Sequence, residues 1–308
     1  MTGSKTTIHI THCPICGNKE FNPFISCKDY FTTQEAFEIM QCKKCGFVFT
    51  QDFPSEEVIG KYYDIPEYVS HSDTQKGIIN ALYHRARKIA LKSKSKIVIK
   101  NSGKKTGMLL EIGCGTGYFL NRMKELKWIV TGIEKSESAR KYAKMKFGLN
   151  CQDSEYLYEI PDKTKDVVAM WHVLEHMEHL NKVMERIHHI LKDDGTAIIA
   201  LPNKDSFDAV HYKKYWAAYD VPRHLWHFSP DSMKELADKH NFELIAIKPM
   251  YMDAFYISML SEKYKKTCLA SLVGLLKGEF FFLRTLFNKN GSSSLIYVLK
   301  KKISLPTT

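Results

Sequence analysis

The stretch LLEIGCGTGYFL, residues 109–120, constrains the fold more than any other part of the chain. An apolar, strand-like run leads into Gly113, Gly115 and Gly117, and a helical pattern follows. Glycines at such a junction let the backbone turn tightly and approach a ligand closely. A second apolar run, WIVTGIE, ends in Glu134 about twenty residues later, where a carboxylate can accept hydrogen bonds from ribose hydroxyls. Together these features predict a site for a cofactor that contains a nucleoside.

Short apolar runs alternate with helical runs through the rest of the chain. The candidate strands are residues 107–112, 128–134, 166–171, 196–202, 242–248 and 294–299. Their continuous apolar character is typical of strands covered on both faces, and the intervening helical runs suit right-handed crossovers. The pattern predicts an α/β fold with a doubly wound, mostly parallel sheet. Ser229 followed by Pro230 predicts the start of one helix.

The glycine loop has the order E-x-G-x-G-x-G, which begins at Glu111. A dinucleotide-binding loop usually has the order G-x-G-x-x-G, so a nicotinamide oxidoreductase is the less favoured interpretation. The loop resembles that of the class I S-adenosylmethionine-dependent methyltransferases. The resemblance continues through Glu134, the stretch DVVAMWHVLEHM (166–177) and ALPN (200–203), and it covers most of residues 107–250.

The resemblance implies S-adenosylmethionine as the cofactor and a role for each matched residue. Glu111 should help to hold the amino-acid end, and the glycine loop should pass beneath the methionine and ribose. Glu134 should bind the ribose, and Trp171 and His172 should line the pocket beside the reactive sulfonium. Asp153 and Ser154 should lie near the adenine. The full implied cofactor-binding set is Glu111, Gly113, Cys114, Gly115, Gly117, Tyr118, Glu134, Asp153, Ser154, Trp171 and His172.

The sequence HVLEH (172–176) also matches the H-x-x-E-H pattern of zinc peptidases, in which both histidines sit on one helical face beside a glutamate. His172, however, ends an apolar strand and is not expected within a helix. The glycine motif already assigns that strand end to a cofactor pocket, so the peptidase hypothesis is disfavoured.

Methyl transfer from a sulfonium needs a positioned acceptor and, for some acceptors, a base that removes a proton. The segment YDVPRHLWHFSP (219–230) is dense in suitable groups, and in related methyltransferases this region lies over the active site. The catalytic candidates are His172, His224, His227 and Tyr219. The sequence itself predicts neither the acceptor atom nor the oligomeric state.

Two C-x-x-C-G motifs, CPICG and CKKCG, lie near the amino terminus. Each motif forms a tight turn that aims two thiolates at one ion, so the pair predicts a structural zinc site formed by Cys13, Cys16, Cys42 and Cys45. Chance pairs or redox disulfides are the less favoured alternatives. Four thiolates leave no open position for water, so the motifs predict a zinc-ribbon-like module over residues 1–52 that folds and docks.

Residues 53–105 are predicted to form a helical, basic connector, with Ser55 as a candidate N-cap. No acidic residue occurs between Thr74 and Leu110, and the net charge of the whole chain is +11. This charge favours anionic partners, among which nucleic acid is an alternative with only weak support. The amino terminus MTGSKTTIHITHCPICG has no apolar region of the secretory-signal type behind its lysine, so the protein is expected to be cytoplasmic.

Residues 106–308 are predicted to form the methyltransferase domain, with an insertion at about 251–291. The apolar stretch 268–287 within this insertion is too short and too interrupted by charge for a transmembrane helix. It could be a lid on the acceptor pocket, a dimer surface, or a helix that makes a peripheral contact with a membrane.

Class I methyltransferases with an amino-terminal zinc module include enzymes that methylate sugars on nucleotide carriers, and the order of domains here is similar. The resemblance therefore favours a small-molecule or glycan-type acceptor, such as a nucleotide- or lipid-linked sugar. A rival hypothesis is an RNA- or protein-binding module whose α/β domain binds a cofactor without turnover.

Overall fold

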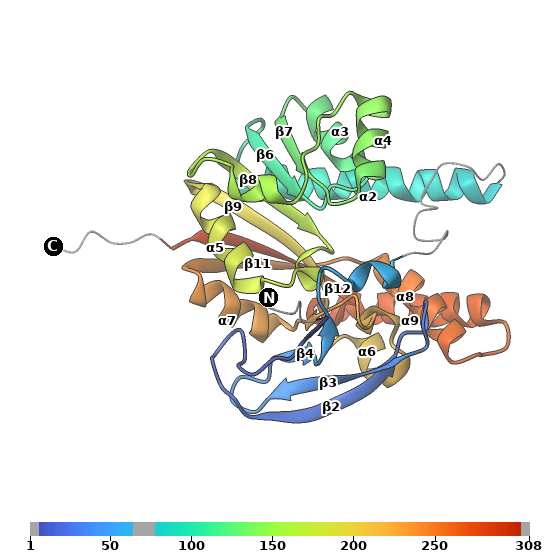
Figure 1. The fold of residues 1–308 in the computed structure, drawn as a ribbon. Coiled ribbons are helices and arrows are strands. Elements are labelled where there is room, and N and C mark those ends of the chain that lie inside the picture. The colour runs from blue at the N-terminus through green and yellow to red at the C-terminus, as the bar shows by residue number, and fades with distance from the viewer. Residues whose placement is uncertain (1–5, 64–77, 303–308) are drawn as a thin grey trace.

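A computed structural model describes residues 6–63 and 78–302 of the protein. At its centre lies a six-stranded sheet with the order β11-β12-β9-β8-β6-β7 (Figure 1). Strands β7, β6, β8 and β9 run parallel, and β12 is antiparallel to both of its neighbours. The strands are β6 (Met108–Ile112), β7 (Ile129–Ile133), β8 (Lys165–Trp171), β9 (Leu191–Pro202), β11 (Phe242–Pro249) and β12 (Ser294–Lys301). The prediction of a mostly parallel sheet is confirmed, and each candidate strand is present.

Helices cover both faces of this sheet. Successive residues of a strand point to opposite faces, so each strand contributes side chains to two cores. Leu109 of β6 belongs to one buried core and its neighbour Leu110 to the other. The first core is covered by α2 (Ile78–Ser102), α3 (Tyr118–Glu125) and α4 (Glu137–Phe147). The second is covered by α5 (Leu180–Ile190) and α7 (Pro230–Lys239). The predicted doubly wound architecture is therefore confirmed.

Two predicted helix starts have different outcomes. Ser229 caps α7 through a reciprocal capping box with Ser232, and Pro230 is the first helical residue, as predicted. Ser55, in contrast, is not an N-cap, because the short helix η1 (Ile59–Tyr62) starts after Val58. The amides of Val58 and Ile59 donate to the Ser55 carbonyl oxygen, and the Ser55 hydroxyl is buried without a hydrogen-bond partner among residues 6–63 and 78–302. The main chain thus replaces the side chain in this turn.

The amino-terminal segment forms an antiparallel sheet below the central one (Figure 1). Its strands are β2 (Phe21–Lys28), β3 (Ala36–Cys42) and β4 (Val48–Thr50), while β1 (Thr7–Ile8) pairs with β5 (Phe53–Pro54). The fourth strand of this sheet is β10 (Trp226–His227), which pairs with β4 from far along the chain. Phe47 and Phe49 join the same buried core as Trp226 and Phe228. The amino-terminal sheet is therefore built into the α/β domain.

Between β11 and β12 the chain forms a helical hairpin of α8 (Asp253–Tyr264) and α9 (Ala270–Phe287). The two helices lie side by side near the amino-terminal sheet (Figure 1). In the described part of the chain, every helix is too short or too polar to cross a membrane. The remaining elements are η2 (Glu155–Tyr158), η3 (Leu174–His176), α6 (Phe207–Tyr212), η4 (Lys213–Tyr215), η5 (Ala217–Tyr219) and η6 (Lys289–Gly291).

Candidate active site

The glycine loop between β6 and α3 has the conformation that its sequence predicts. Gly113, Gly115 and Gly117 have φ values of 71°, 52° and 80°, which side-chain-bearing residues rarely adopt. The amides of Gly113 and Cys114 both donate to the Ile133 carbonyl oxygen at the end of β7. A Cβ atom on Gly113 would lie 2.3 Å from Cγ2 of Val173. The loop is therefore pressed against the end of β8, and only glycine fits at position 113.

Glu134, the predicted ribose-binding residue, lies directly against this loop. Its carboxylate accepts hydrogen bonds from the amides of Gly115 and Ser136, each at 2.8 Å. Gln152 forms a parallel bridge with Ile133, which places Asp153 and Ser154 next along the chain from this edge. The ends of β6 and β7 thus bring the predicted ribose and adenine residues to one side of the loop.

Buried polar atoms without partners gather at the same end of the sheet. Glu111 is 3% exposed and its Oε2 has no hydrogen-bond partner among the described residues, and burial raises its pKa well above the ordinary value. The indole nitrogen of Trp171 is also buried and unpaired within the described chain. An unpaired buried polar atom costs roughly 1–3 kcal/mol, so such atoms are expected where a ligand supplies the missing partner.

Lys94 is a residue of this site that the sequence interpretation missed. It projects from α2, and its ammonium lies 4.6 Å from the centre of the Trp171 ring. Burial lowers the pKa of Lys94, whereas the nearby charges of Glu111 and Asp253 act to raise it. The sequence placed Lys94 only within a basic run, and the register of α2 against β8 selects it from its neighbours.

His172 follows the last residue of β8 in a left-handed conformation, with φ of 59°. Its Nε2 lies 3.2 Å from an oxygen of Asp253, and its Nδ1 lies 3.4 Å from an oxygen of Glu175. Burial alone would lower the pKa of His172, but hydrogen bonds to these two carboxylates raise it to about 9. At neutral pH the ring is therefore protonated, and it can orient or donate but cannot act as a base.

Asp253 is a second site residue that the sequence interpretation missed. It is the first residue of α8, and it reaches His172 because α8 begins where β11 ends. An acidic residue in the first helical turn after a strand is the local signal that could have marked it.

The H-x-x-E-H match does not form the geometry of a peptidase. His172 precedes the short helix η3, so the two histidines do not share one face of an α-helix. The possible ligand atoms of Glu175 and His176 instead lie within 4.8 Å of His224, and this trio could hold a cation. Burial and the neighbouring His224 lower the pKa of His176 to about 4, so its ring is neutral. This geometry agrees with the expectation that a peptidase is disfavoured.

The other catalytic candidates lie among structural contacts. His224 Nδ1 is 2.8 Å from the Ala218 carbonyl oxygen, and its ring lies 4.5 Å from that of His176. His227 is buried with Nε2 at 3.0 Å from the Thr50 hydroxyl, and burial lowers its pKa well below the ordinary value. Tyr219 is buried against the rings of Trp216 and His227. A catalytic role for these three residues stays a prediction.

The four predicted metal ligands converge in the amino-terminal sheet. Their sulfur atoms all lie within 4.8 Å of one another, with Cys13 at 3.5 Å from Cys45 and Cys16 at 3.5 Å from Cys42. Gly17 and Gly46 close two equivalent turns. The Gly17 amide donates to the Cys13 carbonyl oxygen, and the Gly46 amide donates to the Cys42 carbonyl oxygen. The cluster holds only thiol donors, which suits a tetrahedral zinc ion with no open position.

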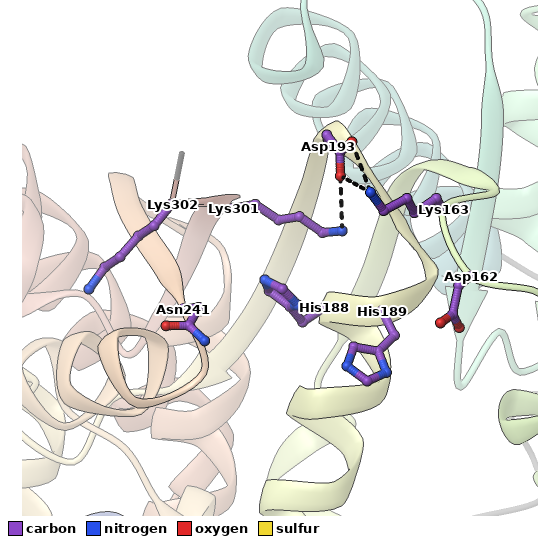
Figure 2. A pocket seen from close by; sticks show the side chains of 8 residues that line it. All are labelled: Asp162, Lys163, His188, His189, Asp193, Asn241, Lys301 and Lys302. Carbon is purple, nitrogen blue, oxygen red and sulfur yellow. Dashed lines mark hydrogen bonds and ion pairs between the residues drawn. The ribbon is translucent and has the colours of Figure 1, made fainter. Parts of the chain in front are cut away.

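A hollow of about 580 Å³ lies at the opposite end of the sheet (Figure 2). Lys163 precedes β8, Asp193 lies near the start of β9 and Lys301 ends the antiparallel β12, so the hollow faces the amino ends of the parallel strands. Figure 2 shows the ammonium groups of Lys163 and Lys301 directed at Asp193. The described lining residues of the hollow include neither a glycine loop nor an unpaired buried acid, which are the features found at the carboxyl ends of the strands.

Comparison with known proteins agrees with this geometry. Residues 82–247 match the model of a family described as a methyltransferase domain, and the match covers more than half of the chain. An uncharacterized protein of Methanocaldococcus jannaschii is 30% identical over 156 residues, which are 51% of this chain and 68% of that relative. The malonyl-[acyl-carrier protein] O-methyltransferase of Bacillus anthracis is 28% identical over 110 residues, which are 33% of this chain and 40% of the relative.

Among solved structures, a protein from Pyrococcus horikoshii OT3 is similar to this chain with a TM-score of 0.50 and 17% identity. The similarity covers 77% of this chain and 100% of that one. At this identity the likeness concerns the fold alone.

Proposed function

The chain belongs to the methyltransferase domain family, and from this premise we propose that it methylates a small-molecule or glycan-type acceptor. Its activity class is S-adenosylmethionine-dependent methyl transfer. The acceptor that we favour is a sugar on a nucleotide or lipid carrier.

The observation that carries the cofactor assignment is the meeting of three features at one end of the sheet. The backbone of the glycine loop adopts positive φ angles, the Glu134 carboxylate lies against it, and Glu111 is buried with an oxygen that no described residue pairs. S-adenosylmethionine offers an ammonium group, ribose hydroxyls and a purine, and so fits a site with a buried acid and a second carboxylate beside the glycine loop.

The protein's own residues orient the reaction and control the proton. When bound, S-adenosylmethionine would supply an electrophilic methyl group on a sulfonium, with a neutral thioether as the leaving group. Trp171 supplies an apolar wall, and His172 is held between Asp253 and Glu175. Because His172 is protonated at neutral pH and both of its N–H groups are directed at carboxylates, we infer that it acts by holding Asp253 and Glu175 in place beside the acceptor. An acceptor that needs deprotonation would have to use a carboxylate, and Asp253 is the more exposed of the two that contact His172.

The arrangement of the amino-terminal sheet supports an acceptor smaller than RNA. Its edge strand β4 is covered by β10, so the sheet is joined to the α/β domain over the segment that carries His224 and His227. This arrangement suits a module that shapes the acceptor pocket. The names of two relatives are those of O-methyltransferases, for malonyl-[acyl-carrier protein] and for ubiquinone biosynthesis, and neither name refers to nucleic acid.

Glu134→Ala tests the cofactor site. Loss of its hydrogen bonds to ribose should weaken S-adenosylhomocysteine binding by roughly 1–3 kcal/mol, as measured by calorimetric titration. Glu137→Ala is the matched control, because Glu137 is exposed on the neighbouring helix and forms an ion pair with Lys141. Equal affinity of Glu134→Ala and the wild type would remove Glu134 from the site.

The acceptor class is tested by transfer of a labelled methyl group from S-adenosylmethionine to separate panels of nucleotide sugars, lipid-linked sugars and RNA. We expect label in a sugar panel that is lost with Glu134→Ala. Label only in RNA would contradict the acceptor proposal and leave methyl transfer intact. Steep loss of RNA binding with salt, without transfer, would favour the binding-module alternative.

We further propose that the four-cysteine cluster binds structural zinc. Cys42→Ser should release zinc, as measured by metal analysis, and loosen the amino-terminal sheet while leaving cofactor binding largely intact. Cys27→Ser is the matched control, because Cys27 is buried in the same sheet but outside the cluster. Full zinc content in Cys42→Ser would contradict the site, and loss of cofactor binding would show that the two regions are coupled.

A further inference from the structure

The outer face of α9 carries the largest group of exposed apolar side chains in the described chain. These residues are between 46% and 93% exposed, and they recur at spacings of three and four that place them along one side of the helix. They are Leu269, which precedes the helix, and Leu272, Leu275, Leu276, Phe280, Leu283, Leu286 and Phe287. A contiguous apolar patch of this kind is unusual on a monomer surface and marks an interaction site.

The opposite side of α9 is fully used in packing on α8. A Cβ atom on Gly274 would lie 2.4 Å from the Met259 Cα, and one on Gly278 would lie 2.6 Å from the Phe255 Cα. Phe281 and Thr285 continue the buried side. Because glycine lets the two helices touch backbone to backbone, the orientation of α9 is fixed, and its outer face points away from the protein.

The charges around this face are almost all positive. The cations Lys263, Lys265, Lys266, Arg284 and Lys289 are exposed on the hairpin and its borders. The only acids in residues 254–291 are Glu262 and Glu279. Glu262 is buried and paired with Lys277, so Glu279 is the single exposed carboxylate in this segment. The apolar face therefore has a cationic border.

A basic hollow of about 420 Å³ adjoins the hairpin. Its lining contains Lys213, Lys214 and Lys265 together with His211, Ile25 and two tyrosines, and none of these described lining residues is an acid. Lys277 of α9 lies 3.1 Å from the His211 ring nitrogen, which ties the hollow to the helix. An anionic group is the ligand that such a lining attracts.

We propose that α9 and its cationic border bind the surface of an anionic lipid bilayer. The apolar side chains would enter the boundary between headgroups and acyl chains, while the lysines would contact lipid phosphates. The contact is peripheral, since in the described residues no helix is fit to span a bilayer. A second copy of the chain fits less well, because it would bring the same cations together with one exposed acid from each copy to balance them.

Vesicle binding by the full chain tests this proposal independently of methyl transfer. The wild type should float with vesicles of phosphatidylcholine and phosphatidylglycerol, bind pure phosphatidylcholine vesicles more weakly, and lose affinity as salt rises. The double variant Leu276→Glu/Phe280→Glu should bind about tenfold more weakly. Lys265→Gln/Lys266→Gln should also weaken binding by roughly tenfold and reduce the salt dependence.

The matched control is Ile129→Glu/Met145→Glu, at residues that are 65% and 83% exposed on other elements. It adds the same negative charge and should change the affinity for vesicles by no more than about twofold. S-adenosylhomocysteine affinity, measured on every variant, reports that the domain is folded. Absence of wild-type binding to the anionic vesicles at low salt would overturn the proposal. A wild-type dimer that Leu276→Glu/Phe280→Glu converts to a monomer would likewise overturn it in favour of self-association.

Discussion

The two ends of the central sheet are both rich in charged residues. The buried polar atoms have hydrogen-bond partners at one end, and some of them lack partners among the described residues at the other. At the amino ends, Asp166 accepts hydrogen bonds from Lys104 at 2.5 Å, Lys192 at 2.9 Å and the Met108 amide at 2.7 Å. At the carboxyl ends, an oxygen of Glu111 and the indole nitrogen of Trp171 are buried without hydrogen-bond partners in the described chain. The paired end stabilises the fold, whereas the unpaired end is arranged for a ligand.

The volume of a hollow does not distinguish the cofactor end of the sheet from the opposite end. The hollow in Figure 2 lies at the paired end, and two of the three lysines drawn there, Lys163 and Lys301, are already directed at Asp193. The chemistry of the lining, more than the volume, therefore identifies the cofactor end.

The largest expected effect comes from breaking the paired end. Asp166→Ala should lower the free energy of unfolding by about 3 kcal/mol, because two cations and an amide lose one buried acceptor. The affinity for S-adenosylhomocysteine, in contrast, should change little. Chemical denaturation and calorimetric titration measure the two quantities, and a loss of affinity without a loss of stability would reverse the comparison.

The same residue gives a pH dependence. Burial would raise the pKa of Asp166, but hydrogen bonds from Lys104 and other donors lower it from 3.8 to about 2. A carboxylate with a lowered pKa stabilises the folded state above its unfolded pKa, so this stabilisation is present above about pH 4 and is lost as the pH falls towards 2. Asp166→Ala should lack that part of the acid dependence.

A smaller effect is expected from Gly113→Ala at the unpaired end. The added Cβ would meet Val173 at 2.3 Å in a backbone with φ of 71°, so the loop must shift at a cost of about 2 kcal/mol. We expect S-adenosylhomocysteine to bind roughly 30-fold more weakly. Gly148→Ala is the control, because its φ of 61° imposes the same strain in open space outside the site. Equal losses of affinity in both variants would contradict a role for the loop.

The smallest effect is expected from His172→Asn. Asn tolerates the left-handed backbone and keeps a hydrogen-bond donor, but it does not titrate. Burial would lower the pKa of His172, and Asp253 and Glu175 raise it to about 9. A raised pKa stabilises the folded state fully below the ordinary value of 6.5 and loses that effect as the pH rises through about 9.

The wild type should therefore lose about 1–2 kcal/mol of stability, together with activity, between neutral pH and pH 9 to 10, and His172→Asn should not. Thermal unfolding across this pH range measures the difference. His188→Asn at the paired end is the control and should keep the wild-type alkaline profile. A wild-type profile that is flat up to pH 10 would mean that the two carboxylates do not hold the His172 proton.

The parts of the site that could be predicted from the sequence are those fixed by local chain geometry. The strand, the glycine loop and the first helical turn follow one another within a few residues, and both C-x-x-C turns are similarly local. Lys94 and Asp253 could not be predicted, because they enter the site from α2 and α8, whose positions depend on packing against the sheet. The pairing of β10 with β4 was missed for the same reason, since a two-residue strand carries no pattern of its own.

That pairing has a consequence for how the chain folds during synthesis. The Thr50 hydroxyl donates to the His224 carbonyl oxygen across 174 residues of chain, so the amino-terminal sheet waits for its edge strand while most of the α/β domain is translated. All four clustered cysteines, in contrast, have emerged by position 45. A metal ion bound early by these cysteines would keep β2 and β3 together until β10 is synthesised. During that time the open edge of β4 is exposed to pairing with neighbouring nascent chains.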